Sequence, residues 1–196
     1  MSAIEAPSAA PKDGRVLVHL GCGERYIPGF VHVDIRPLPH VDIVAPIDRL
    51  EAFQDGSVDL IYNCHVLEHV RRGEELRVLS EWYRVLKVGG VLRTSVPDFE
   101  AIVFWYQKTS SLEDLVGLLY GRQNYQYNFH FQAFDFARLQ RLLEAVGFKD
   151  VRRYDWRETP HRNYDDFSQA YLPHMDKEHG VLMSLNVEAT KAEQPV

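Results

Sequence analysis

The stretch from Val16 to Asp34 constrains the fold more than any other part of the chain. It opens with an apolar run, Val16 to Leu20, which is typical of a strand buried in a parallel sheet. The run breaks at Gly21-Cys22-Gly23, where the backbone can turn sharply and approach a ligand closely. A second short strand, Phe30 to Ile35, carries Asp34 near its carboxyl end. A glycine turn after one strand and an acid after the next predict a nucleotide site at the edge of a doubly wound sheet.

The rest of the chain alternates strand patterns with helix patterns. Apolar runs predict strands at 41–44, 57–63, 91–96, 151–156 and 181–191, and helical spacing predicts helices that end at Gly89-Gly90 and at Gly147. This alternation indicates the α/β class with a mainly parallel sheet. With 196 residues, the chain is long enough for one domain, which we expect at residues 15–191. Residues 1–14 and 192–196 are expected to be tails, the first of them mobile, and 158–180 a long loop or lid.

Composition excludes several classes of function. The net charge of −6 makes no case for nucleic acid, and two cysteines, Cys22 and Cys64, imply no disulfide framework. No apolar run approaches the roughly 18 residues of a membrane span. The first residues lack the basic start and apolar run of a signal peptide, so a cytoplasmic protein is the default expectation.

Taken in order, the motifs of the chain resemble the Rossmann-like class I methyltransferases that use S-adenosylmethionine. More narrowly, they resemble the small methyltransferases often associated with cell-surface polysaccharide biosynthesis. The resemblance runs over residues 16–191 and rests on segments that are weak singly but specific in their order. They are His19 to Gly23, Val33-Asp34, Val58 to Tyr62, Val66 to Val70, Arg84 to Gly90, Ser95 to Asp98, Leu142 to Phe148 and Ser184 to Lys191. The resemblance implies a seven-stranded sheet of order 3-2-1-4-5-7-6 with the last strand antiparallel.

The first crossover departs from the usual dinucleotide layout. Tyr26 stands where a third glycine would be, and 34 − 23 = 11 positions separate Gly23 from Asp34, against about 20 in that layout. The seven residues from Glu24 to Phe30 would span about 10 Å as a helix, whereas the strand to be retraced is about 17–20 Å long. The first crossover helix is therefore predicted to be short or absent. The flank beside the first strand then needs another cover: the N-terminal tail, the long loop or a second subunit in a homodimer.

The resemblance also implies where the cofactor S-adenosylmethionine would bind. In the family the glycine turn passes beside the amino-acid part of the cofactor, and an acid in the position of Asp34 accepts hydrogen bonds from the ribose. The acid that often contacts adenine is replaced by Pro46, so Asp48 is a candidate substitute. The predicted cofactor-binding residues are Gly21, Cys22, Gly23, Asp34, Asp48, Asn63 and His65.

Histidines at two places are candidates for catalysis. His65 and His69 follow the strand at 57–63 with Glu68 between them, and His130 lies among tyrosines, phenylalanines and amides in the segment 122–134. A hydroxyl acceptor benefits from a general base, and histidine suits that task near neutral pH. The base is placed among His130, His69 and His65, each of which has a structural role as its alternative. No metal is predicted, because His65, Glu68 and His69 have no fourth ligand at a recognisable spacing.

The function expected from these features is O-methylation of a sugar or polysaccharide precursor. Aromatic faces stack on sugar rings and amides bond hydroxyls, which favours the segment 122–134 as the acceptor side. One alternative is a non-catalytic binding subunit with the same fold, favoured by Pro46 and the short crossover. A second alternative is a nicotinamide-dependent reductase or epimerase, against which Tyr26 and Leu67-Glu68-His69 argue.

Overall fold

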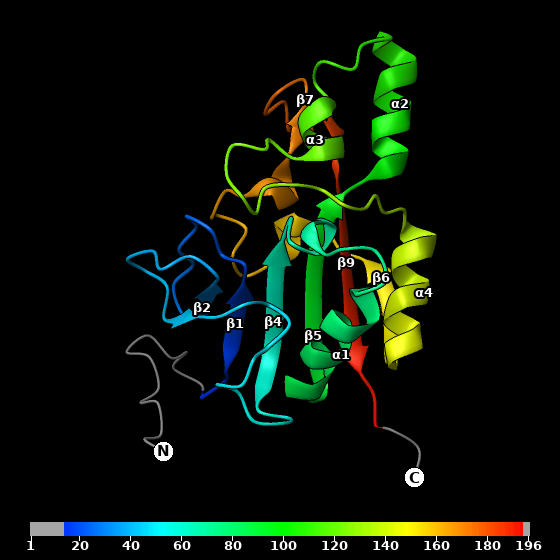
Figure 1. Ribbon diagram of the computed structural model, residues 1–196. Helices are drawn as coiled ribbons and strands as arrows, with labels where there is room; N and C mark the ends of the chain where they lie inside the picture. Colours follow the sequence, from blue (N-terminus) through cyan, green and yellow to red (C-terminus); the bar gives the residue numbers. More distant parts are fainter. Residues whose placement is uncertain (1–13, 194–196) are drawn as a thin grey trace.

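The computed structural model describes residues 14–193, so nearly all of the predicted N-terminal tail lies outside the described residues. A seven-stranded sheet forms the centre of the molecule, in the order β3-β2-β1-β4-β5-β9-β6 (Figure 1). Strand β9 runs antiparallel to both of its neighbours, while the other pairs are parallel. The expected order, with the last strand antiparallel, is confirmed. The strands are β1 (Leu17–Leu20), β2 (Val31–Asp34), β3 (Ile43–Val44), β4 (Val58–Cys64), β5 (Leu86–Pro97), β6 (Phe148–Arg153) and β9 (Ser184–Lys191).

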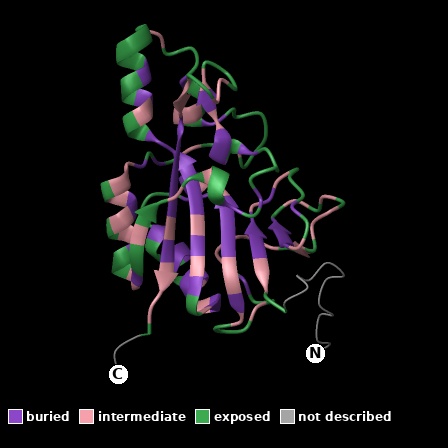
Figure 2. Ribbon diagram, turned by 180° about the vertical axis from the view of Figure 1, so that it is seen from behind, coloured by how far each residue is buried: buried purple, intermediate pink, exposed green. Residues whose placement is uncertain are grey.

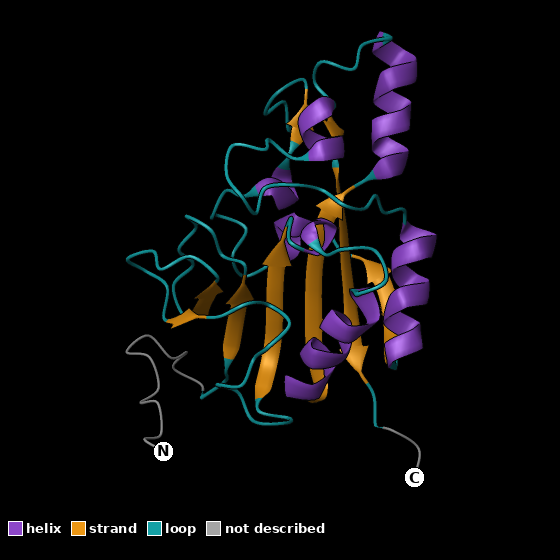
Figure 3. Ribbon diagram, in the orientation of Figure 1, coloured by secondary structure: helices purple, strands orange, loops and turns teal. Residues whose placement is uncertain are grey.

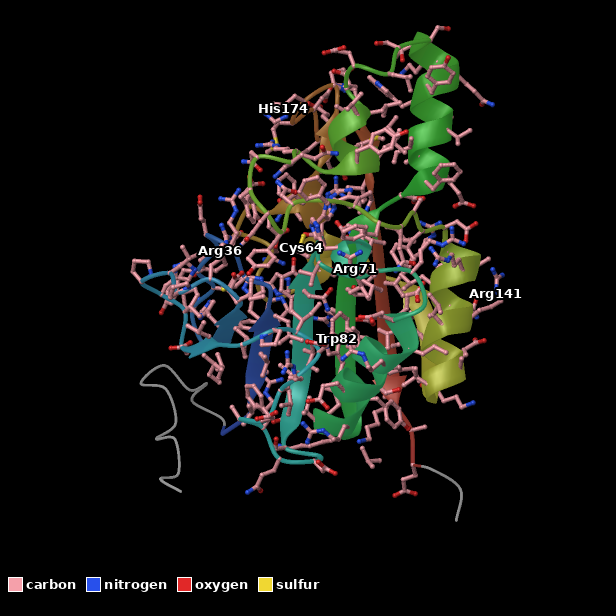
Figure 4. All side chains as sticks on the ribbon, viewed as in Figure 1. Arg36, Cys64, Arg71, Trp82, Arg141 and His174 are labelled. Atoms are coloured by element: carbon pink, nitrogen blue, oxygen red, sulfur yellow. The ribbon has the colours of Figure 1, made fainter. Side chains whose placement is uncertain are left out.

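Two helices cover one face of this sheet. Helices α1 (Glu75–Val85) and α4 (Phe136–Val146) lie in front of β5, β9 and β6 in Figure 1. Trp82 of α1 is fully buried in the main core, and its indole nitrogen donates to the Ile47 carbonyl at 2.8 Å (Figure 4). Asp135 caps α4 by accepting from the Arg138 amide, and Gly147 ends it at φ 117°. The predicted stop at Gly147 is confirmed.

The boundaries around β5 differ from the sequence prediction. Helix α1 ends at Val85 rather than at Gly89-Gly90, because Leu86 turns to an extended backbone and opens β5. The two glycines instead lie in an irregular part of β5, between the pairs Val58–Leu86 and Leu60–Val91. A β-carbon on Gly90 would come within 2.8 Å of the Lys87 carbonyl oxygen, so the bulge requires glycine here.

Two other predicted strands are also corrected. Strand β6 occupies 148–153 rather than 151–156, because it starts directly after the glycine that ends α4. The single strand predicted at 181–191 is divided at Met183 into β8 (Val181–Leu182) and β9. Strand β8 pairs with β7 (Tyr171–Leu172) in a separate hairpin.

The first crossover contains turns and no helix, as its length predicts. Figure 3 shows loops joining β1 to β2, β2 to β3 and β3 to β4. As a result, no α-helix of residues 14–193 covers the face opposite α1 and α4 (Figure 2). The loop after β6 covers part of that face, since His161 packs against Phe30 and Tyr62 at ring distances of 5.9 and 4.2 Å. The long loop, one of the three proposed covers, therefore lies over part of this flank, whereas the N-terminal tail falls outside the described residues and the second-subunit cover stays a prediction.

A smaller unit stands beyond the carboxyl edge of the sheet. Helices α2 (Phe99–Thr109) and α3 (Val116–Tyr120) pack with Met183 around their own small core (Figure 1). Three short 3-10 helices complete the elements: η1 (Leu67–His69), η2 (Trp156–Glu158) and η3 (Phe167–Gln169). Within residues 14–193, the helices are too short or too polar to cross a membrane.

Candidate functional site

The glycine turn lies where β1 meets β2 at the carboxyl edge of the sheet. The Gly21 amide donates to the Val33 carbonyl at 2.7 Å, which extends the β1–β2 pairing into the turn. Gly21 has φ 61°, and a β-carbon there would stand 2.6 Å from Cγ2 of Val66. Both the backbone angle and the close approach of Val66 therefore require glycine at this position.

Asp34 fastens the same turn from the end of β2. One carboxylate oxygen accepts the Gly23 amide at 2.8 Å, and the other accepts the Arg36 amide at 2.9 Å. The guanidinium of Arg36 contacts Asp34 at 3.3 Å and lies 4.8 Å from the centre of the Tyr125 ring. Arg36 lies over the loops beyond β2, on the side of the molecule away from α4 (Figure 4). The turn, Asp34 and the segment 122–134 thus come together, although Asp34 as a ribose ligand stays a prediction.

Three other predicted cofactor residues are Cys22, Asn63 and Asp48. Cys22 is a buried free thiol whose Sγ lies 3.7 Å from the Gly23 carbonyl oxygen, and burial raises its pKa to about 12. Cys64 is also a free thiol. Asn63 is fully buried at the end of β4, where its amide oxygen accepts from the Thr94 hydroxyl and its amide nitrogen has no partner. Asp48 forms an ion pair with Arg77 of α1 at 2.6 Å. Their roles as cofactor ligands stay predictions.

His65 is enclosed at the end of β4. Its Nε2 lies 2.8 Å from the Ser184 hydroxyl, and its ring stacks on Phe167 with 5.1 Å between centroids. Burial lowers the pKa of His65 to about 3, so the ring is neutral near pH 7. His65 also has φ 54°, a strained backbone conformation. A hydrogen bond from the His65 amide to the Ser95 carbonyl helps to hold it. With Ser184 on one side and Phe167 on its face, this ring has little access to an acceptor.

Glu68, His69 and His130 form a cluster next to His65. Glu68 is fully buried, and neither of its carboxylate oxygens has a hydrogen-bond partner. Its Oε1 lies 3.4 Å from Nδ1 of His65 and 3.9 Å from Nε2 of His130, beyond ordinary hydrogen-bond length. Burial raises the pKa of Glu68 to about 8. An ionised carboxylate without partners is costly to bury, so Glu68 is mostly protonated near pH 7 and its place in this cluster requires a functional explanation.

The two histidines of the cluster are oriented by backbone carbonyls. Nδ1 of His69 donates to the Phe129 carbonyl at 3.0 Å, and Nδ1 of His130 donates to the Leu118 carbonyl at 2.8 Å. Because a carbonyl only accepts, each Nδ1 carries the proton and each Nε2 keeps its lone pair. Burial lowers the pKa of both rings, that of His69 to about 4. Both are therefore neutral near pH 7, with a nitrogen able to take a proton or bind an ion.

The sequence identified all of these histidines as candidates, but it did not predict that His130 contacts Glu68. His65, Glu68 and His69 are neighbours in sequence, whereas His130 reaches them only because the segment 122–134 folds over η1. The Phe131 amide donates to the Glu68 carbonyl at 2.8 Å and fixes that arrangement. Phe167 and Ser184, which hold His65, were not predicted. No local pattern distinguishes them from ordinary loop and strand residues.

Comparison with known proteins gives consistent matches. Residues 28–94 match a family model described as a methyltransferase domain. Over 154 residues the chain is 29% identical to a probable S-adenosylmethionine-dependent methyltransferase of Mycolicibacterium smegmatis. That alignment covers 69% of this chain and 52% of the relative, so the chain spans about half the length of the protein it matches.

Solved structures resemble the whole sheet. A methyltransferase dependent on the same cofactor, from Archaeoglobus fulgidus, superposes with a TM-score of 0.56 at 16% identity, covering 90% of this chain and 86% of the other. A Burkholderia thailandensis 1,6-didemethyltoxoflavin N1-methyltransferase, solved with S-adenosylhomocysteine, gives 0.55 at 15% identity over 92% and 73% of the two chains. At these identities the structures establish the fold alone.

Proposed function

We propose that this chain is a class I S-adenosylmethionine-dependent methyltransferase domain and that it methylates a hydroxyl group of a sugar or polysaccharide precursor. One observation carries the choice of acceptor. The cluster of Glu68, His69 and His130 stands at the carboxyl end of β4 beneath a segment rich in aromatic rings and amides. This arrangement supplies proton-accepting groups next to a surface suited to sugar rings.

The residues around the glycine turn fit the cofactor. Gly21 stands directly against Val66, and both Gly21 and Gly23 have a left-handed backbone, so the turn keeps this path beside the end of β1 only with glycine at these positions. Asp34 brings a buried carboxylate to the same turn. A cavity of about 370 Å³ lies beside the loop where the family holds adenine; residues 43–46 and 49–53 line it, and none of the predicted cofactor residues does. Gly21, Gly23 and Asp34 would hold the amino-acid and ribose parts, and the cofactor would supply an electrophilic methyl group.

The chain's own contribution to the reaction is alignment and proton removal. Holding two reactants in line accounts for several kcal/mol of barrier lowering, and a base typically adds about 10²–10⁴-fold in rate. Nε2 of His69 or of His130 is the favoured proton acceptor, because Nδ1 of each ring already donates to a carbonyl. His65 is less suited, since Ser184 and Phe167 enclose its ring.

The segment 122–134 supplies the acceptor side. Exposed rings flank the cluster along this segment, where they can stack on a sugar, and amides between them can bond its hydroxyl groups. The rings are Tyr125, Tyr127, Phe129 and Phe131, and the amides of the same stretch are Gln123, Asn124, Gln126 and Asn128. Tyr125 also contacts Arg36, which joins this segment to the glycine turn.

Calorimetry followed by an acceptor screen tests the proposal. The protein is expected to bind S-adenosylhomocysteine and not NAD, and Asp34→Asn is expected to weaken that binding about tenfold or more. Asp150→Asn, on the exposed strand β6, is the matched control, because asparagine tolerates its left-handed backbone. Methyl transfer from labelled cofactor to nucleotide sugars then identifies the acceptor. Binding of neither ligand would favour a non-catalytic subunit, and binding of NAD alone would contradict the proposal.

A further inference from the structure

The cluster of Glu68, His69 and His130 has the composition of a metal site. Each of these residues offers one ligand atom, and the three atoms lie within 4.8 Å of one another. Two imidazoles and one carboxylate are a ligand set used by zinc and by other divalent transition metals. The sequence predicted no metal, because it offered no further ligand near Glu68. The fold supplies one in His130.

The distances within the cluster suit atoms that share an ion. Nε2 of His130 and Nδ1 of His65 face Oε1 of Glu68 at 3.9 and 3.4 Å, too long for hydrogen bonds. Two ligands at about 2.1 Å from one ion stand about 3.4 Å apart at the tetrahedral angle. The rings of His69 and His130 are 4.8 Å apart and nearly perpendicular, so they do not stack on each other. The separation between Glu68 and His130 is thus about 0.5 Å longer than this spacing, and a small side-chain movement would bring both atoms onto one ion.

The surroundings of the cluster prepare it for an ion. The Phe129 and Leu118 carbonyls accept the Nδ1 protons of His69 and His130, and this kind of outer contact fixes the ring of a metal-bound histidine. Glu68 is fully buried with both carboxylate oxygens unpartnered. A dication would give that carboxylate the partner it lacks among the described residues.

We propose that Glu68, His69 and His130 bind one divalent transition-metal ion, for which Zn²⁺ is the probe. Three protein ligands leave at least one coordination position open, which is the arrangement of a catalytic metal site. His65 lies beside the site at the end of β4. Its Nδ1 is 3.4 Å from Oε1 of Glu68, and its Nε2 contacts the Ser184 hydroxyl, so His65 would help to position the Glu68 carboxylate.

The role of the ion rests on the proposed function, whereas its binding does not. The open position would take the acceptor hydroxyl oxygen and lower the pKa of that hydroxyl. The O–H bond then breaks with its proton passing to solvent water, and the two ring nitrogens act as ligands rather than as bases. The ion would thus perform the deprotonation that the metal-free cluster assigns to His69 or His130.

Metal binding to untagged, chelator-treated protein tests the site. We expect one equivalent of Zn²⁺ to bind with submicromolar affinity in competition with a chromophoric chelator. Glu68→Gln and His130→Ala are each expected to weaken binding more than about a hundredfold. His179→Ala, which removes an exposed histidine outside the cluster, is the matched control and should bind as wild type does. Stoichiometric binding that both cluster variants retain would overturn the proposal, as would the absence of binding in wild type.

A spectroscopic measurement keeps the test independent of variant folding. Co²⁺ added to the wild-type protein should give the visible absorption of a four- or five-coordinate nitrogen and oxygen site, and Zn²⁺ should displace it. A spectrum of the hydrated ion alone would count against the site. Calorimetry with S-adenosylhomocysteine on the same samples separates the two proposals. Cofactor binding without metal binding defeats only the metal site, and metal binding without cofactor binding defeats only the methyltransferase.

Discussion

Gly21 is the residue on which the shape of the glycine turn, the proposed cofactor site, depends most directly. A β-carbon there would meet Val66 at 2.6 Å, and the φ of 61° is unfavourable for any other residue. We expect Gly21→Ala to cost about 1–2 kcal/mol for the backbone and about 1–3 kcal/mol for the overlap. Binding of S-adenosylhomocysteine should be lost, because relief of the overlap moves the turn.

The control for that change is Gly117→Ala in helix α3. A β-carbon at Gly117 meets nothing within 4 Å, so alanine should leave cofactor binding unchanged and raise helix propensity. Urea unfolding and calorimetry measure both variants. Equal effects of the two substitutions would contradict the special role of the turn at Gly21.

Among single residues, the sequence could predict those that lie close together along the chain and form a local pattern. The glycines and Asp34 are separated by one crossover, and the structure joins them through the Gly23 amide. The approach of His130 to Glu68 depends instead on how the segment 122–134 crosses η1. Such a contact between distant segments leaves no spacing that a sequence can display.

The long loop between β6 and β7 takes the place of a helix beside β1. Asp166 anchors it, accepting the Ser168 amide at 2.9 Å with one oxygen and the Tyr62 hydroxyl with the other. We expect Asp166→Ala to destabilise the protein by about 2 kcal/mol, because it leaves the buried Tyr62 hydroxyl without its acceptor. Hydrogen exchange should rise in residues 158–172 more than in α4, since the loop loses its anchor locally.

Asp165→Ala is the matched control for this loop. Asp165 is exposed and forms only a surface ion pair with Lys177 at 3.2 Å, so its removal should cost less than about 0.5 kcal/mol. Exchange that rises equally in both variants would show that the anchor is not at Asp166.

The lengths of the elements explain which of them the sequence could predict. The missing crossover helix follows from chain reach alone, since seven residues cannot both form a helix and retrace a strand. The glycines at 89–90 misled the prediction because a helix stop and a strand bulge use the same residue type. The early start of β6 has a similar cause, because no linker separates it from the end of α4.

For the whole molecule, the missing helices leave the two faces of the sheet with different chemistry. One face packs an apolar core against α1 and α4, while the other carries His19, His32 and Tyr62. His161 of the long loop covers Tyr62, and Tyr26 of the first crossover covers His32. Buried histidines on that second face are neutral, since burial lowers the pKa of His19 to about 3 and that of His161 to about 4. The amino-acid composition could not reveal these lowered pKa values, because they depend on which histidines are buried and not on how many the chain contains.

This burial predicts a loss of stability in mild acid. Below pH 6.5 the unfolded chain binds a proton at each of these rings, while the folded protein does not bind one until about pH 3 to 4. Stability is therefore fully present above pH 6.5 and falls as the pH decreases, by up to about 1.4 kcal/mol per pH unit for each ring. Other buried histidines add to the total, so the informative measurement is a difference between variants.

His161→Phe isolates one of these contributions. It keeps a ring against Tyr62 and removes the titrating group, so its free energy of unfolding in urea should fall less steeply from pH 6.5 to 5 than that of wild type. The expected difference in slope approaches about 1.4 kcal/mol per pH unit. Thr109→Val, which removes a hydroxyl bonded to the Trp105 carbonyl, should lower stability equally at both pH values. Parallel slopes for wild type and His161→Phe would mean that the buried ring already takes its proton in the folded state.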